Sequence, residues 1–134
     1  AMPAGGLARW GLISPTGIIT TMNKAGIPVY NYMVAYKMPF FGGQVMCHTS
    51  DLALWFGSME GAAYQYRGDE TNAQRVSNHM MDALAAFAAS GDPSCKLLKW
   101  TPYTTDAHNT MVFDVKSGCK VDFDRAVYEA MMNQ

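Results

Sequence analysis

A nearly continuous apolar run, from Pro28 to Tyr36, is the feature that most restricts how this chain can fold. The run reads Pro-Val-Tyr-Asn-Tyr-Met-Val-Ala-Tyr and is rich in aromatic and β-branched side chains. Strands that are covered on both faces have this composition, as in a parallel sheet flanked by helices. The run therefore predicts a central strand in a fold that mixes strands and helices.

The clearest helical signal lies between Asp69 and Ser90. Apolar side chains recur there at spacings that place them on one helix face, namely Val76, Met80, Leu84, Phe87 and Ala88. Asp69 or Thr71 offers the N-cap, and Thr71 with Gln74 has the spacing of a capping box. Gly91 ends the helix, because glycine tolerates the left-handed conformation that closes a helix. We expect the apolar face to be buried.

Weaker local signals predict the remaining elements. A helix is expected from Ser14 and Pro15, which suit a cap and a first helical position, to Gly26. A short helical turn is expected at 51–56, between the irregular stretches 37–43 and 58–68. A hairpin and a last helix are expected over Thr110–Asp114, Cys119–Phe123 and Asp124–Met132. The predicted fold class is α/β, with few strands and flanking helices.

The composition is that of a compact, core-forming chain. Of its 134 residues, 49% are hydrophobic and 16% are charged, and the net charge of -1 arises from scattered residues of both signs. Such a chain offers no charged block to nucleic acid or to an anionic membrane surface. No apolar run reaches the roughly 18 residues that a membrane-spanning helix needs. We therefore expect no nucleic-acid partner and no membrane association.

The three cysteines, Cys47, Cys95 and Cys119, are widely and unequally spaced. They form no CxxC pair and no zinc-finger pattern, so we expect no metal site and no cofactor. Cys95 and Cys119 lie in expected loops, where they either pair in an oxidising compartment or remain free thiols.

His48 is the best candidate for acid–base chemistry among the three histidines. It lies on a glycine-flanked loop soon after the expected central strand, where open α/β sheets place functional residues. His79 lies within the long helix and is interpreted as a satisfied helical side chain, and His108 as a polar turn residue. A thiol mechanism with Cys47 is disfavoured, because adjacent side chains on an extended loop point apart.

Several segments of the chain resemble a known family. The stretch from Gly43 to Phe56 reads Gly-x-x-x-Cys-His-x-Ser-Asp-Leu-x-x-x-Phe, which resembles the histidine loop of the type B carboxylesterases. This family includes the cholinesterases and the para-nitrobenzyl esterases. Further segments are similar to it in the same order, namely Val29–Tyr32, Phe87–Pro93, Trp100–Thr104 and Thr110–Asp114. The resemblance extends from about Ile18 to the C-terminus.

The resemblance implies a fold and a set of roles. Members of the family are α/β-hydrolases that cleave esters with a serine, an acid and a histidine, in that order along the chain. Residues 1–134 would be the C-terminal segment of such a domain, single but incomplete. His48 would take the serine proton and return it to the leaving alcohol. Asp51 would orient that histidine, unless it caps the short helix after it. Thr49 departs from the glycine that often follows the family's histidine.

The sequence lacks the Gly-x-Ser-x-Gly string that holds the nucleophile in this family. We therefore expect the serine and the acid in sequence outside this chain, which alone would be inactive. The chain is either the C-terminal part of a carboxylesterase for small carboxylic esters, or a non-catalytic interaction module that retains the esterase fold. Its central strand and helix stripe would expose apolar surface. We expect the missing N-terminal portion or a second copy to cover it.

Overall fold

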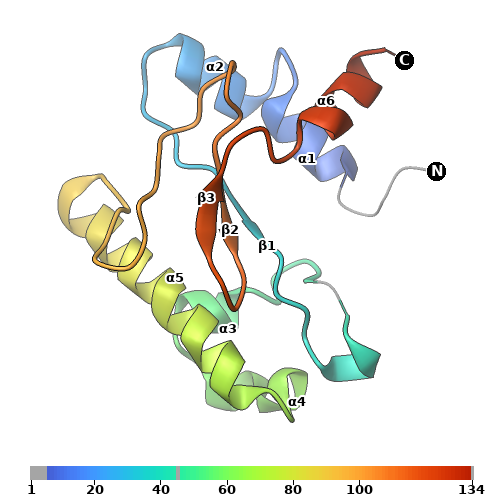
Figure 1. Cartoon of the computed structure of the whole chain (residues 1–134), viewed down its shortest axis with the longest axis vertical. Helices are drawn as coiled ribbons and strands as arrows, with labels where there is room; N and C mark the ends of the chain where they lie inside the picture. The colour runs from blue at the N-terminus through green and yellow to red at the C-terminus, as the bar shows by residue number, and fades with distance from the viewer. Residues whose placement is uncertain (1–5, 45, 134) are drawn as a thin grey trace. The chain divides into compact units, whose positions relative to one another are not determined.

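The computed structural model describes residues 6–44 and 46–133 of the protein (Figure 1). The chain forms two compact units, each assembled from separate stretches. The terminal unit contains the residues up to 31, residues 101–110 and those from 120 onward. The sheet unit contains residues 32–100 and 111–119 and holds nearly all of the β-sheet.

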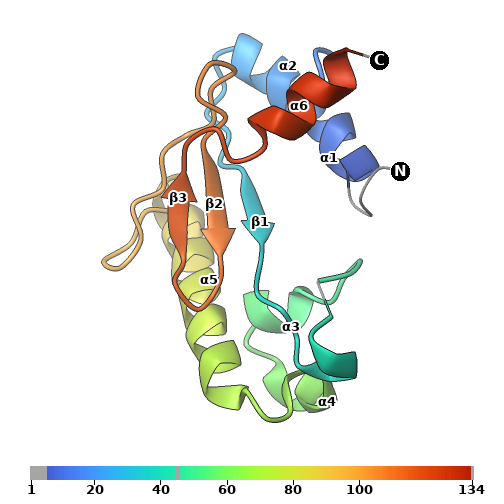
Figure 2. The same cartoon turned by 45° about the vertical axis from the view of Figure 1, so that its right-hand side comes forward.

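Three short strands form one sheet in the order β1, β2, β3 (Figure 2). β1 (Tyr32–Val34) runs parallel to β2 (Thr110–Phe113), and Met33 lies opposite Val112. β3 (Gly118–Lys120) follows β2 after a short turn, which confirms the predicted hairpin, although β3 begins earlier and ends sooner than expected. Every residue of β2 is buried. The predicted α/β class with few strands is confirmed.

β1 differs from the strand that its sequence predicts. Only residues 32–34 of the apolar run 28–36 are in strand, and they lie at the edge of the sheet. The prediction of a central strand is therefore wrong for the described part of the chain. Tyr32 is 40% exposed. The composition of the run is that of a strand inside a sheet, covered on both faces. Among the described residues, however, β1 is hydrogen-bonded to a strand on one side only, which is β2.

The long helix α5 (Glu70–Ser90) is confirmed, and Gly91 ends it in the left-handed region at φ 77°. The predicted capping box is wrong, because Thr71 lies inside the helix. Asp69 holds the N-cap position without a side-chain cap hydrogen bond. Its carboxylate instead accepts hydrogen bonds from the Tyr36 hydroxyl and the Asn72 amide. Neither α5 nor any other described helix is long and apolar enough to cross a membrane.

The buried face of α5 matches the prediction in its first half only. The buried residues of the helix are Ala73, Val76, Ser77, Met80 and Ala83. The predicted positions Leu84, Phe87 and Ala88 are exposed instead. The first half packs on α3 (Leu52–Trp55), and the Ser77 hydroxyl donates to the Leu54 carbonyl at 2.8 Å. The second half therefore presents apolar side chains to solvent.

Short helical elements occupy the stretches predicted to be irregular. They are η1 (Phe40–Gly42), η2 (Met59–Ala62) and α4 (Ala63–Tyr66). The turn predicted at 51–56 is α3, and Gly57 follows it at φ 63°. A Cβ at Gly57 would lie 2.7 Å from the Met81 sulfur. Both the backbone conformation and this close approach favour glycine there.

The terminal unit consists of α1 (Gly6–Ile13), α2 (Ile18–Lys24), α6 (Arg125–Met132) and the segment 101–110. Its apolar core contains Ile13, Ile19, Val29, Tyr103 and Tyr128. The predicted helix start at Ser14 is wrong, because the Ser14 N–H donates to the Trp10 carbonyl at the end of α1. Gly26 follows α2 at φ 74°, as predicted. The last helix is confirmed by α6.

Candidate functional site

His48 lies on the loop between η1 and α3, and its side chain is exposed. Ser50 holds this loop. Its side-chain oxygen accepts the Cys47 N–H at 2.9 Å and donates to the Cys47 carbonyl at 2.7 Å. Because Ser50 is itself buried, it anchors the loop to the interior, while the His48 imidazole extends into solvent.

The backbone at Thr49, next to His48, adopts the left-handed conformation with φ 65°. This conformation costs a non-glycine residue roughly 1–2 kcal/mol. The Thr49 hydroxyl donates to the His48 carbonyl at 2.6 Å. The loop thus has a conformation that favours glycine at the position where the sequence departs from glycine.

Asp51 connects the histidine loop to β1. It occupies the N-cap position of α3, but its side chain makes no cap hydrogen bond. The alternative that the Asp51 carboxylate caps this helix therefore has no hydrogen bond to support it. Its carboxylate Oδ2 accepts the Tyr32 hydroxyl at 3.4 Å. Burial and the charge of Asp51 raise the pKa of Tyr32. The orienting role of Asp51 toward His48 stays a prediction.

Tyr66 of α4 supports the loop from the interior. Its side chain is buried, and its hydroxyl donates to the Ser50 carbonyl at 3.3 Å. Burial raises the pKa of Tyr66 to about 12, and the charges of Asp51 and Tyr64 act in the same direction. In the folded sheet unit Tyr66 is therefore a neutral phenol at pH values below this pKa.

We expect the sheet unit to lose stability as the pH rises from about 10 to about 12. A free tyrosine ionises near pH 10, whereas Tyr66 keeps its proton up to a pKa of about 12 in the fold. Between these values the folded state binds more protons than the unfolded state, so the free energy of unfolding falls with pH. Urea denaturation below pH 10 and near pH 12 checks this fall. Tyr66→Phe should reduce it more than the same change at the exposed Tyr64, whose charge is only the smallest of the causes that raise the pKa of Tyr66. Equal slopes in both variants would contradict the assignment to Tyr66.

His79 is half-buried in α5, and its ring Nδ1 lies 3.1 Å from the Ser117 hydroxyl. Ser117 belongs to the turn between β2 and β3. This contact agrees with the interpretation of His79 as a helical side chain that has a hydrogen-bond partner. His79 is therefore part of the packing of α5 against the hairpin.

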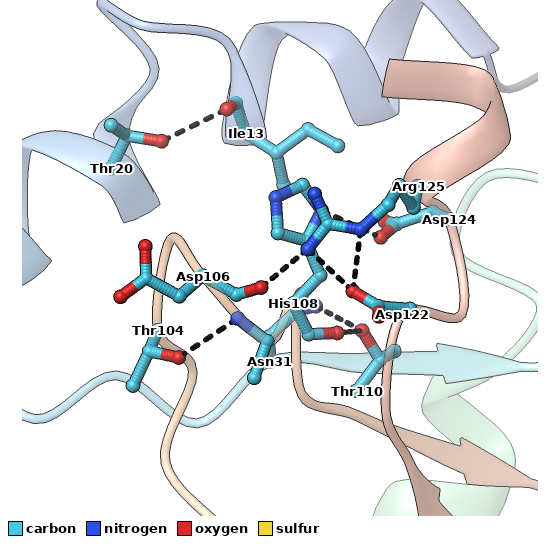
Figure 3. A network of polar contacts seen from close by, with 11 residues as sticks. Ile13, Thr20, Asn31, Thr104, Asp106, His108, Thr110, Asp122, Asp124 and Arg125 are labelled. Atoms are coloured by element: carbon cyan, nitrogen blue, oxygen red, sulfur yellow. Dashed lines mark hydrogen bonds and ion pairs between the residues drawn. The ribbon is translucent and has the colours of Figure 1, made fainter. Parts of the chain in front are cut away.

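The interpretation of His108 as a polar turn residue is wrong. The residue is 2% exposed, and its backbone has φ 47°. Its Nδ1 lies 3.4 Å from Oδ1 of Asp124, the residue before α6 (Figure 3). The rings of Tyr103 and Tyr128 pack on the imidazole at centroid distances of 5.5 and 5.0 Å. His108 is thus an interior side chain of the terminal unit.

Further polar contacts surround this pair (Figure 3). Arg125 forms an ion pair with Asp122 and also donates to the Asp106 carbonyl. The Asn31 amide donates to the Thr110 hydroxyl at 2.8 Å, and that hydroxyl donates to the His108 carbonyl at 3.0 Å. A general base must reach the group whose proton it takes. Because His108 is buried and closed in by these neighbours, we interpret it as a packing residue of the terminal unit.

Within residues 6–44 and 46–133, no group of three or more His, Cys, Asp or Glu side chains is placed to hold a metal ion. Cys47, Cys95 and Cys119 are free thiols. A hollow of about 620 Å³ between α3, η2 and α5 has Ser58, Glu60 and Gln74 among its lining residues. Neither His48 nor Asp51 lines it, so the histidine loop lies outside this hollow.

Comparisons with known proteins point to one family. The model of the carboxylesterase family matches residues 12–130 of the chain. No curated protein matches the chain.

Solved esterases share the fold. An esterase from anaerobic Clostridium hathewayi, described as able to hydrolyse aliphatic aromatic polyesters, matches with a TM-score of 0.75 and 20% identity over 96% of this chain and 30% of its own. A PNB esterase matches with a TM-score of 0.70 and 20% identity over 79% of this chain and 22% of its own. A carboxylesterase from Geobacillus stearothermophilus matches with a TM-score of 0.66 and 25% identity over 79% of this chain and 23% of its own. The chain spans less than a third of the length of these structures.

Proposed function

Since the chain belongs to the carboxylesterase family, we propose that it is the C-terminal part of a carboxylic ester hydrolase and that His48 is the catalytic histidine. The exposed imidazole on a loop held by Ser50 and Tyr66 is the observation that carries this proposal. A catalytic histidine has to meet a nucleophile on one ring nitrogen and an acid on the other. Exposure leaves both nitrogens accessible to partners from outside the chain.

In the complete enzyme His48 acts as both general base and general acid. It takes the proton of the serine hydroxyl as that oxygen attacks the ester carbonyl, and it then donates the proton to the leaving alcohol. The serine, and the acid that orients the imidazole, come from the remaining part of the enzyme. General acid–base catalysis alone contributes only about 10²–10⁴-fold. The isolated chain is therefore inactive, and small carboxylic esters are the substrates of the complete enzyme.

A non-catalytic interaction module is the second candidate function. Large apolar side chains on the sheet unit favour it, because Leu52 is 49% and Phe56 is 69% exposed. Exposed apolar patches on soluble proteins mark surfaces that bind a partner. Such a module would keep the esterase fold without its chemistry.

Reconstitution from two pieces distinguishes the two functions. The probe is the Geobacillus stearothermophilus carboxylesterase from which the segment matching this chain has been removed, mixed with this chain and a short-chain p-nitrophenyl ester. We expect no hydrolysis by either piece and measurable hydrolysis by the mixture. The removed segment itself, added back in place of this chain, is the positive control. A mixture that binds but stays inactive, while the control is active, would favour the interaction module.

A further inference from the structure

His48 is the second residue of a four-residue turn. The Ser50 N–H donates to the Cys47 carbonyl at 3.1 Å, and this hydrogen bond closes a β-turn over residues 47–50. Thr49, the third residue, has φ 65°, and a positive φ at the third residue is what a type II turn requires. The direction of the His48 imidazole therefore depends on the backbone of this turn.

The Ser50 side chain closes the same turn a second time. Its hydroxyl oxygen accepts the Cys47 N–H at 2.9 Å and donates to the Cys47 carbonyl at 2.7 Å. These contacts are made to the Cys47 backbone, and the Cys47 thiol takes no part in them. The Met46 sulfur lies 3.3 Å from the same hydroxyl oxygen. Ser50 thus joins the first and last residues of the turn through both its backbone and its side chain.

A turn with this backbone needs contacts that hold it. The left-handed region costs a threonine free energy, and such strain persists only where the surrounding structure maintains it. The hydrogen bonds between Ser50 and Cys47 span Thr49 and supply that constraint. Without the Ser50 hydroxyl, Thr49 would be freer to leave the left-handed region, and the His48 imidazole would move with it.

Ser50 is itself anchored in the interior of the sheet unit. It is 8% exposed, and the buried Tyr66 hydroxyl donates to its carbonyl at 3.3 Å. The Tyr66 ring packs on that of Tyr36, which follows β1, with centroids 6.4 Å apart. The Tyr36 hydroxyl donates at 2.9 Å to Asp69, the residue before α5. Buried aromatic side chains therefore connect the turn to the elements around it.

We propose that Ser50 is a positioning residue for His48, and this inference rests on the proposed function. Ser50 acts through the turn, because its hydroxyl holds the backbone that carries the imidazole. The ring nitrogens are then directed to meet the serine and the acid from the rest of the enzyme. Catalysis is sensitive to such placement, since a displacement of about 1 Å can lower a rate by about 10²-fold.

Ser50→Ala removes the hydroxyl and keeps the backbone. Mixed with the truncated Geobacillus stearothermophilus carboxylesterase, this variant should show a kcat at least tenfold lower than the unmodified chain, which is about 1.4 kcal/mol of barrier. KM, and the affinity for the truncated esterase by sedimentation velocity, should stay within about twofold. Ser58→Ala is the matched control, because Ser58 is exposed and makes no side-chain cap hydrogen bond. We expect its kcat within about twofold of the unmodified mixture.

Two further variants test whether the hydroxyl itself is responsible, should Ser50→Ala fold poorly. Ser50→Thr keeps the hydroxyl, whereas Ser50→Val has nearly the same shape without it. The steric cost of the added group is therefore common to both variants. We expect the kcat of Ser50→Thr to be at least fivefold higher than that of Ser50→Val. Equal kcat values in this pair would contradict the proposal.

Amide hydrogen exchange of the free chain tests the turn without any ester or truncated esterase. The Cys47 N–H should exchange more slowly than in an unstructured chain, and Ser50→Ala should remove this protection. The Phe56 N–H donates to the Leu52 carbonyl at 3.1 Å and should stay protected in both chains, which controls for unfolding. Unchanged protection of the Cys47 N–H in Ser50→Ala would overturn the proposal.

Failure of this inference and failure of the proposed function give different results. An unchanged kcat in Ser50→Ala, in a mixture that His48→Ala inactivates, would refute the role of Ser50 and leave that of His48 intact. Loss of Cys47 protection in a chain whose mixtures show no hydrolysis would support the turn and contradict the proposed function. A fall in affinity as large as the fall in kcat would make Ser50 a structural residue instead.

Discussion

His48→Ala should abolish ester hydrolysis by the reconstituted enzyme, lowering kcat/KM by roughly 10⁴-fold or more. Without the imidazole, the serine hydroxyl has no base to take its proton and the leaving alcohol has no acid to protonate it. The effect should be on catalysis alone, because the exposed side chain of His48 is not part of the packing. Initial rates of p-nitrophenol release, with binding measured in parallel by sedimentation, check this result.

Cys47→Ala is the matched control for His48. Cys47 is adjacent in sequence and also exposed, so its removal changes the same loop without removing the proposed base. We expect its activity within about twofold of the unmodified mixture. Substantial hydrolysis remaining after His48→Ala, or an equal loss in Cys47→Ala, would rule out His48 as the catalytic base.

His108→Ala should be the most destabilising single substitution of a histidine, costing roughly 3–5 kcal/mol of unfolding free energy. The substitution removes a buried ring that contacts Tyr103 and Tyr128 and leaves a cavity between them. It also removes the ring nitrogen that lies 3.4 Å from Oδ1 of the buried Asp124 carboxylate. Urea unfolding followed by near-ultraviolet circular dichroism measures the change, because Tyr128 and Trp10 lie in the same unit.

His79→Ala is the matched control for this prediction. His79 contacts the Ser117 hydroxyl and is only half-buried, so its loss should cost about 1 kcal/mol or less. Similar losses in the two variants would contradict the interior role of His108. Asp124→Asn, which removes the charge and keeps the shape, should fall between them.

Elements with strong local signals could be predicted from the sequence. The end of α5 was predictable because Gly91 is suited to the left-handed conformation that closes the helix. β2 and α6 follow from short, well-bounded patterns at 110–113 and 125–132. These signals depend on a few neighbouring residues, so no knowledge of the tertiary structure was needed.

The errors arise where distant segments decide the outcome. The Asp69 carboxylate, at the start of α5, accepts a hydrogen bond from the distant Tyr36 hydroxyl instead of capping the helix. The exposure of Leu84 and Phe87 depends on how far the contact between α5 and α3 extends along the helix. His108 is enclosed by Tyr103 and by Asp124 and Tyr128, which come from the last stretch of the chain. No local pattern around any of these positions contains that information.

The candidate site was found through family resemblance rather than through local pattern. His48 is one of three histidines, and its own loop does not mark it as catalytic. Several segments that resemble the family in the same order singled it out as the candidate. The role of Ser50 at the base of the loop could not be predicted, because it depends on the buried hydroxyl of Tyr66 in a later helix. The left-handed backbone of Thr49 was equally hidden, since β-branched residues rarely adopt it.

The terminal unit draws on the first residues, a middle stretch and the last residues of the chain. Removing either α1 or α6 therefore removes part of the same unit. Its contacts also join residues that are far apart in sequence, such as Asn23 and the Tyr103 carbonyl. High contact order of this kind slows folding. During synthesis the unit has to wait for α6, the helix that follows Asp124, before its interior can close.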